Sequence, residues 1–289
     1  MEDNQTYTPT PFQDLSFWQR IKASYSFAWQ NKITIAKFVL PVFIIGITLA
    51  WFEIKSYLDT IIAYFMIALF YIHKQEGHLN HITWKKFKEA CGYTWLNALV
   101  YGGLFGICIF LPAMIVSFIM FLVMGLYMGI IGLVLLLIPI IIVGHFGLYK
   151  SIFYDKKANE TFQCIKHVWK MMKGNWLSTI AYFFISNLSL LLVTIVPVFI
   201  SLIIICFVVF WSTGKLPEDY SNHIEILMML GVVIIFYIAF TLIPITGYIQ
   251  FEYLHHKYEK NRQDDEEAKN YTEDKYEGDA LFQMINKED

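Results

Sequence analysis

The chain has 289 residues, of which 57% are hydrophobic and 16% charged, and its mean hydropathy is +0.49. Soluble domains are about half apolar and about a quarter charged, so this composition excludes an ordinary soluble domain and predicts an integral membrane protein. The formal net charge of −2 hides an asymmetry, because residues 264–289 hold ten acidic residues against three lysines and the rest of the chain is basic.

The N-terminal segment, residues 1–12, is polar and contains Pro9 and Pro11. We expect it to be disordered, and it lacks the makeup of a cleavable signal peptide. The four cysteines are widely spaced and form no CxxC pair, which argues against a disulfide framework or a thiolate zinc site.

Six apolar runs follow in a predicted membrane domain of residues 13–261. A hydrocarbon core of about 30 Å needs about 20 helical residues, and each run is read as one span. The runs are 33–52, 56–73, 97–124, 126–149, 177–211 and 226–250. We therefore expect an all-α integral membrane fold whose six transmembrane helices form three hairpins. The long run 177–211 is expected to be one tilted or kinked helix.

Charge gives the predicted orientation. With six crossings and a cytoplasmic N-terminus, the outer segments hold only Lys55 and Lys215 of the 22 lysines and arginines, as the positive-inside rule requires. The second span is the shortest, and leaving it out would put Lys85, Lys86 and Lys88 outside. Both termini are therefore expected in the cytoplasm.

One pattern precedes three of the apolar blocks. The three copies are WQRIKASYSFAWQN (18–31), WKKFKEACGYTWLN (84–97) and FQCIKHVWKMMKGN (162–175). Each predicts an amphipathic helix in the headgroup plane at the cytoplasmic surface, and the final asparagine is expected to mark the bend into the bilayer. The alternative is that basic and aromatic residues flank any membrane hairpin, without internal repetition.

In the first copy the predicted apolar stripe includes Trp18, Ile21 and Trp29, whereas Arg20 and Ser24 lie off it. Anionic headgroups would attract the lysines. The candidate lipid or partner contacts are Lys22, Lys88, Lys166, Lys173, Asn31, Asn97, Asn175, Trp29, Trp95 and Trp176.

The segment ANETFQCIKHVWKMMKGNWLSTIAYFF (158–184) contains Lys173, Gly174, Asn175 and Trp176 in succession. It resembles the A-x-x-x-S-x-x-L-x-K-G-N-W passage of bacterial multi-span proteins related to the membrane domain of glycerophosphodiester phosphodiesterases. The resemblance implies a six-span protein of the bacterial cytoplasmic membrane. The soluble phosphodiesterase barrel that some relatives carry is not in this sequence, so the resemblance does not imply its activity.

Histidines offer the main candidates for chemistry. His73, His78 and His81 can in principle approach one metal, but their spacing fits no familiar zinc pattern, and an ordinary interfacial loop is expected. His255 and His256 are expected to contact headgroups. No catalytic triad, HExxH, P-loop or paired carboxylate appears, so we expect no enzyme, no catalytic or metal-binding residue and no cofactor.

Within the spans, His145 and Asn187 form the candidate intramembrane polar site. Asn187 lies between Ser186 and Ser189, and packing through interhelical hydrogen bonds is the expected role of this patch.

The C-terminal segment, residues 262–289, is strongly acidic and is expected to be a disordered cytoplasmic tail. Its apolar island at 280–285 could dock on a protein partner as a short helix. The tail could also only solubilise the chain, or fold back on its basic helices.

These features favour a non-enzymatic protein of the bacterial cytoplasmic membrane that scaffolds or regulates partners, or organises lipid, at the cytoplasmic face. The expected partners are anionic lipid headgroups and a protein that takes the tail, with no nucleic acid. The alternative is a channel or transporter for a neutral or lipid-like molecule, and a membrane enzyme that acts on lipid is a third reading.

Overall fold

The computed structural model describes residues 15–51, 58–154, 161–213 and 221–285, and within them every regular element is a helix. The predicted all-α fold is confirmed. The elements are α1 (Phe17–Gln30), α2 (Lys32–Trp51), α3 (Leu58–Glu76), α4 (Trp84–Phe105), the π-helix η1 (Gly106–Phe110), α5 (Leu111–Phe153), α6 (Thr161–Met172), α7 (Trp176–Thr213) and α8 (Ser221–Ile285).

Among the described residues, five helical stretches are long and apolar enough to cross a membrane. They are Lys32–Leu49, Trp84–Val123, Leu136–Phe153, Trp176–Ser201 and Gly231–Asp264. The predicted span 56–73 corresponds to α3, which is not one of the five. α3 lies at the centre of the packing instead, where Met66 and Phe70 have no exposed surface.

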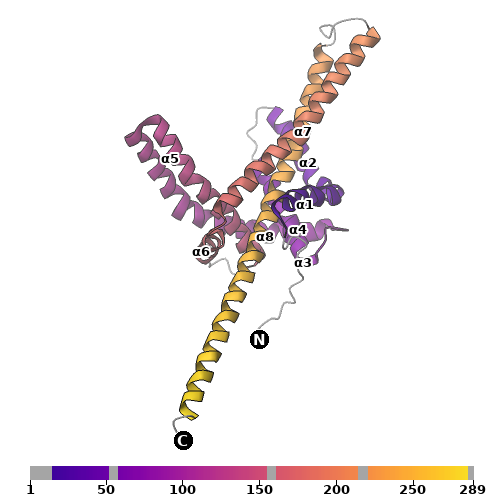
Figure 1. Ribbon diagram of the computed structural model, residues 1–289. Helices are drawn as coiled ribbons and strands as arrows, with labels where there is room; N and C mark the ends of the chain where they lie inside the picture. Colours follow the sequence, from indigo (N-terminus) through magenta and orange to yellow (C-terminus); the bar gives the residue numbers. More distant parts are fainter. Residues whose placement is uncertain (1–14, 52–57, 155–160, 214–220, 286–289) are drawn as a thin grey trace.

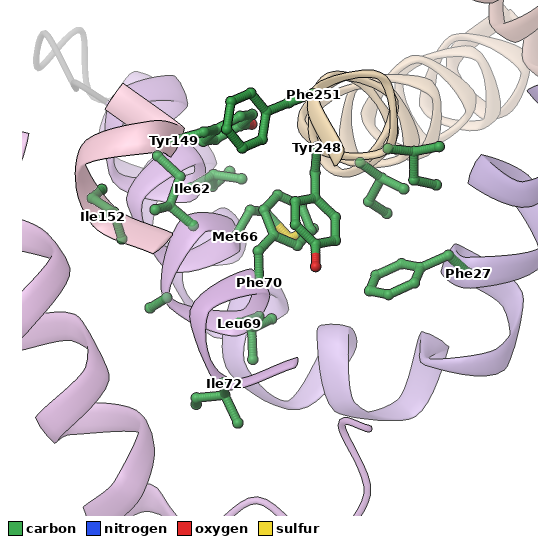
Figure 2. Close-up of a cluster of buried hydrophobic side chains, with 14 of the residues drawn as sticks. Phe27, Ile62, Met66, Leu69, Phe70, Ile72, Tyr149, Ile152, Tyr248 and Phe251 are labelled. Atoms are coloured by element: carbon green, nitrogen blue, oxygen red, sulfur yellow. The ribbon is translucent and has the colours of Figure 1, made fainter. Parts of the chain in front are cut away.

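Helices α1, α3 and α6 pack against α8, and α4 packs against α3 (Figure 1). The core between them is rich in aromatic side chains, and the Phe70 and Tyr248 rings stack with centroids 4.5 Å apart. Figure 2 shows Phe27 of α1 and Tyr149 of α5 beside this pair. Burial of such large rings gives each of them about 2–3 kcal/mol of transfer free energy, so the core holds α1, α3, α5 and α8 together.

The α5 hairpin projects from this core (Figure 1). Its two limbs meet at Gly125, whose φ of +76° is a conformation that glycine adopts without steric penalty. The turn therefore falls where the sequence places the break between the runs 97–124 and 126–149. The first limb continues from α4 through η1, which inserts one wider turn ahead of Pro112.

Helix α7 is a single helix of 38 residues that contains Pro197, as the sequence predicts for the run 177–211. It packs beside the first part of α8, and the two project together from the core (Figure 1).

The C-terminal segment differs from the expected disordered tail, because α8 continues as a helix to Ile285. At the start of this extension Arg262 lies 3.1 Å from Glu259 and 3.6 Å from Glu266. Such pairs, three and four residues apart, stabilise exposed helix. A hydropathy argument misses this, because it measures the capacity to form a core and not the local propensity of Glu, Lys and Ala for helix.

Candidate functional site

The final asparagine of each copy makes the same hydrogen bond. Asn31 Nδ2 donates to the Phe27 carbonyl (2.9 Å), and Asn175 Nδ2 donates to the Met171 carbonyl (3.1 Å). Asn97 Nδ2 donates in the same way to the carbonyl four residues earlier, at Tyr93 (2.9 Å). The repeated sequence pattern therefore corresponds to a repeated side-chain geometry.

The backbone turns at the final asparagine in the first and third copies but not in the second. A turn separates α1 from α2 at Asn31, and residues 173–175 form the turn between α6 and α7, with Gly174 at φ +81°. Asn97 lies inside the continuous helix α4, so the predicted bend at Asn97 is wrong. Its neighbours Leu96 and Ala98 favour helix. The Asn97 side chain therefore makes its hydrogen bond within a helix that continues past it.

The first copy has two faces, and the predicted stripe mixes them. Arg20 and Ser24, which the pattern puts off the stripe, are buried, with Arg20 only 3% exposed. Trp18 and Trp29, which the pattern puts on it, are 68% and 71% exposed. The inward face of α1 therefore combines Arg20 and Ser24 with the buried Ile21 and Phe27, and the two tryptophans lie on the outward face.

The outward face recurs in the other copies. We call the following exposed residues the outer faces: Trp18, Lys22 and Trp29 of α1; Trp84, Lys88 and Trp95 of α4; Phe162, Lys166 and Trp169 of α6. Lys173 is exposed just beyond α6, and Trp176 is half-buried with its ring edge against Trp169, centroids 5.3 Å apart. The predicted lysines and tryptophans are thus accessible, apart from Trp176.

The inward side meets a stretch of α8 whose polar residues contact α1, α3, α5, α6 and α7. We call this the α8 polar layer, and it consists of Gln250, Glu252, His255, Lys257 and Glu259 with the residues that they contact. Gln250 accepts a hydrogen bond from the Arg20 guanidinium of α1 and donates to Thr179 of α7 (3.2 Å). One amide therefore links α1, α7 and α8.

Glu252 is the buried acid of the layer, with 2% of its surface exposed. Lys74 Nζ of α3 lies 2.7 Å from its carboxylate, and the Tyr154 hydroxyl at the end of α5 donates to the same oxygen (2.9 Å). A buried carboxylate is tolerated only when it is paired and hydrogen-bonded, so these contacts fix α3 and α5 against α8.

Arg20 has no carboxylate partner among the residues that the structure describes. Its guanidinium lies over the ring of Tyr253 (3.9 Å) and near that of Tyr182 (5.3 Å), and their faces attract a cation. Desolvation by burial lowers the pKa of Arg20, and the two tyrosines act in the opposite direction. Aromatic faces and the Gln250 amide thus take the place of a counter-ion.

Asn175 connects the third copy to the layer. Lys257 of α8 donates to Asn175 Oδ1 (2.9 Å), while Asn175 Nδ2 holds the Met171 carbonyl. The asparagine therefore fixes both the turn and the neighbouring helix.

The candidate intramembrane site does not form one centre. His145 of α5 lies against Gly247 of α8, where a Cβ would come 3.0 Å from its Nε2. Asn187 of α7 is exposed, and no hydrogen bond or ring contact between the two residues is found in the described part of the chain. Ser189 shares a hydrogen bond with Tyr25 (2.9 Å), which is the packing role expected of this patch.

The other histidines also differ from expectation. His73 is buried and shares a hydrogen bond with Tyr248 (3.2 Å), whereas His78 and His81 are exposed in the loop after α3. His255, expected to contact headgroups, is buried in the polar layer. That expectation is wrong, because α5 and α6 cover this face of α8.

Sequence reasoning missed Arg20, Lys74, Gln250 and Glu252. A signal was present in FEYLHHKYEK (251–260), where charged residues and histidines are mixed with aromatic residues directly after an apolar run. Composition alone cannot distinguish such a segment from a headgroup contact, because its partners come from helices far away in the sequence.

No family model, curated protein or solved structure matches the chain.

Proposed function

We propose that this chain is a non-enzymatic, multi-pass protein of the bacterial cytoplasmic membrane that binds anionic lipid and organises partners at the cytoplasmic face. The observation that carries the proposal is the set of outer faces, in which each copy exposes a lysine between two exposed aromatic residues. Aromatic residues with a lysine are the composition of interfacial anchors.

The outer faces suit a membrane surface better than water. Exposed tryptophans are costly in water but favourable at the headgroup level, where the ring reaches apolar chains and the lysine meets phosphate. Lys32 lies 3.5 Å from the centroid of the Trp29 ring, a further cation beside the aromatic face of α1. Each anionic headgroup contact of a lysine is worth about 1 kcal/mol, so three copies together retain lipid effectively.

The six-span, three-hairpin topology with both termini in the cytoplasm belongs to this proposal. In it α3 crosses as the second span, buried by its neighbours, and the α8 polar layer lies at the cytoplasmic ends of the spans. The relation to glycerophosphodiester phosphodiesterase membrane domains and a protein partner for the acidic end of α8 are likewise proposed. A reporter inserted at 214–220 that is active in the cytoplasm would contradict the topology.

The test is lipid retention by the full chain. The triple variant Lys22→Glu, Lys88→Glu, Lys166→Glu, purified in detergent, should lose most of its co-purifying anionic lipid in native mass spectrometry. The matched control is Lys260→Glu, Lys269→Glu, Lys275→Glu, which changes the net charge equally on the extension of α8. Equal lipid retention by the two variants would contradict the proposal.

The alternative function, movement of a lipid-like molecule, is favoured by one observation. A groove of about 320 Å³ lies between α2 and α8, with Phe43, Ile47 and Tyr237 among its lining residues. A groove of that size with apolar walls fits part of an acyl chain. Lipid scrambling in proteoliposomes that is lost in Ile47→Trp, or in Asn187→Leu or His145→Leu, would favour this alternative over a scaffold.

A further inference from the structure

The α8 polar layer meets α6 at a group of side chains that the proposed lipid function does not use. His255 and Glu259, four residues apart, lie on one side of α8, and His167 of α6 lies against them. One ligand atom from each of the three residues lies within 4.8 Å of the other two. The His167 Nε2 to Glu259 Oε1 distance is 3.7 Å.

His255 is the buried member of the group, with 4% of its surface exposed. Its ring stacks on Tyr154 with centroids 3.9 Å apart, and the His167 ring lies on it at 5.6 Å. Its Nδ1 is buried and has no hydrogen-bond partner among the residues that the structure describes. A buried polar atom left unsatisfied costs about 1–3 kcal/mol, so its presence here points to a ligand.

Access to the group is open from one side. The His167 and Glu259 side chains keep 20% and 26% of their surface exposed, while His255 forms the floor. A cation could therefore enter from solvent and reach all three donors.

The donor set selects the class of ligand. Two imidazoles and one carboxylate, with a fourth position left for water, form a common zinc-binding set. Metal bonds of about 2.0–2.2 Å require the donors to approach by about 1 Å from their separation here, a movement that side-chain rotation supplies. We propose that His167, His255 and Glu259 bind a divalent transition-metal cation of the zinc class and that this cation joins α6 to α8.

The charged neighbours act in opposite directions. Arg262 lies 3.1 Å from Glu259 Oε2, which leaves Oε1 for the metal and orients the carboxylate, as partners outside the ligand set commonly do. Lys150 Nζ lies 3.2 Å from His255 Nε2. An ammonium can only donate, so without metal the ring proton is on Nδ1, and binding must move it to Nε2 against Lys150. Lys150 therefore weakens the site.

The experiment is a calorimetric titration of Zn²⁺ into the full chain in detergent, without a polyhistidine tag. We expect one site, and we expect His167→Ala, His255→Ala and Glu259→Gln to weaken it by more than about 100-fold, since even residues outside the ligand set are worth about 10- to 100-fold. His256→Ala, the adjacent histidine, should leave the affinity unchanged.

The ligand variants could also lose Zn²⁺ because they misfold, so Lys150→Gln is included as a variant that should bind more tightly. The glutamine carbonyl can accept from His255 Nε2–H, so this variant should bind Zn²⁺ several-fold more tightly than the wild type. Equal or weaker binding by Lys150→Gln would overturn the proposal. So would a wild type that binds no Zn²⁺, or a loss of Zn²⁺ binding in the double variant His78→Ala, His81→Ala but not in the variants of the three proposed ligands. Lipid retention does not enter this measurement, so the two proposals fail separately.

Discussion

Helices α1 and α6 contribute to both the α8 polar layer and the outer faces, and the two surfaces use charge in opposite ways. Inside, Lys74 meets a carboxylate and Arg20 meets rings and an amide, so each cation is held in place by protein. Outside, Lys22, Lys88 and Lys166 are exposed. The comparison teaches that buried charge joins the helices to one another, whereas exposed charge is left for the lipid contact that we propose.

The largest effect is expected inside the layer. Lys74→Ala removes the cation beside the buried Glu252 carboxylate and should lower the free energy of unfolding by about 3–5 kcal/mol, the usual cost of breaking a buried pair. Lys74→Met with Glu252→Leu should recover most of this loss. Thermal or denaturant unfolding in detergent measures both, and equal instability of the single and double variants would contradict the assigned role.

The turn between α6 and α7 should be the next most sensitive place. Gly174→Ala puts a side chain at φ +81°, where nothing lies within 4 Å of the new Cβ, so the cost is purely conformational at about 1–2 kcal/mol. Gly92→Ala, on α4 with equal space, is the control and should stabilise by about 0.5–1 kcal/mol. In the same unfolding assay the two variants should change the free energy of unfolding in opposite directions. A change in the same direction would contradict the left-handed conformation of Gly174 in this turn.

The asparagines should differ although they make the same bond. Asn175→Ala also removes the acceptor of Lys257, and we expect a loss of about 1 kcal/mol. Asn97→Ala loses the bond to Tyr93, but alanine in mid-helix regains about 0.7 kcal/mol of propensity. A near-neutral result is therefore expected at Asn97, and comparable losses at both positions would show that α4 depends on this bond.

The smallest effect on stability is expected on the outer faces. Lys22→Ser should change the free energy of unfolding by less than about 0.5 kcal/mol, as exposed substitutions usually do, while it lowers anionic lipid retention. Unfolding and native mass spectrometry on one sample check both. A large loss of stability would show that Lys22 contributes to the packing of the helices, as the cations of the α8 polar layer do.

The sequence predicts the parts of the fold that local patterns control. The turn at Gly125 and the break at Asn31 follow from apolar run lengths and turn residues, and both are found. The inward position of Arg20 could not be predicted, because a helical wheel sorts residues only by polarity. Its partner Gln250 is more than two hundred positions away in the sequence and comes close only in the folded chain. The helical end of α8 was missed for a different reason, because hydropathy does not measure the local helix propensity of Glu, Lys and Ala.

Helix α8 has a mechanical consequence, because it is unbroken from the projecting pair with α7 through the polar layer to Ile285 (Figure 1). At 1.5 Å per residue its 65 residues span about 100 Å. The partner that we propose for the acidic end would therefore bind the same helix whose Gln250, Glu252 and His255 contact α1, α3, α5 and α6.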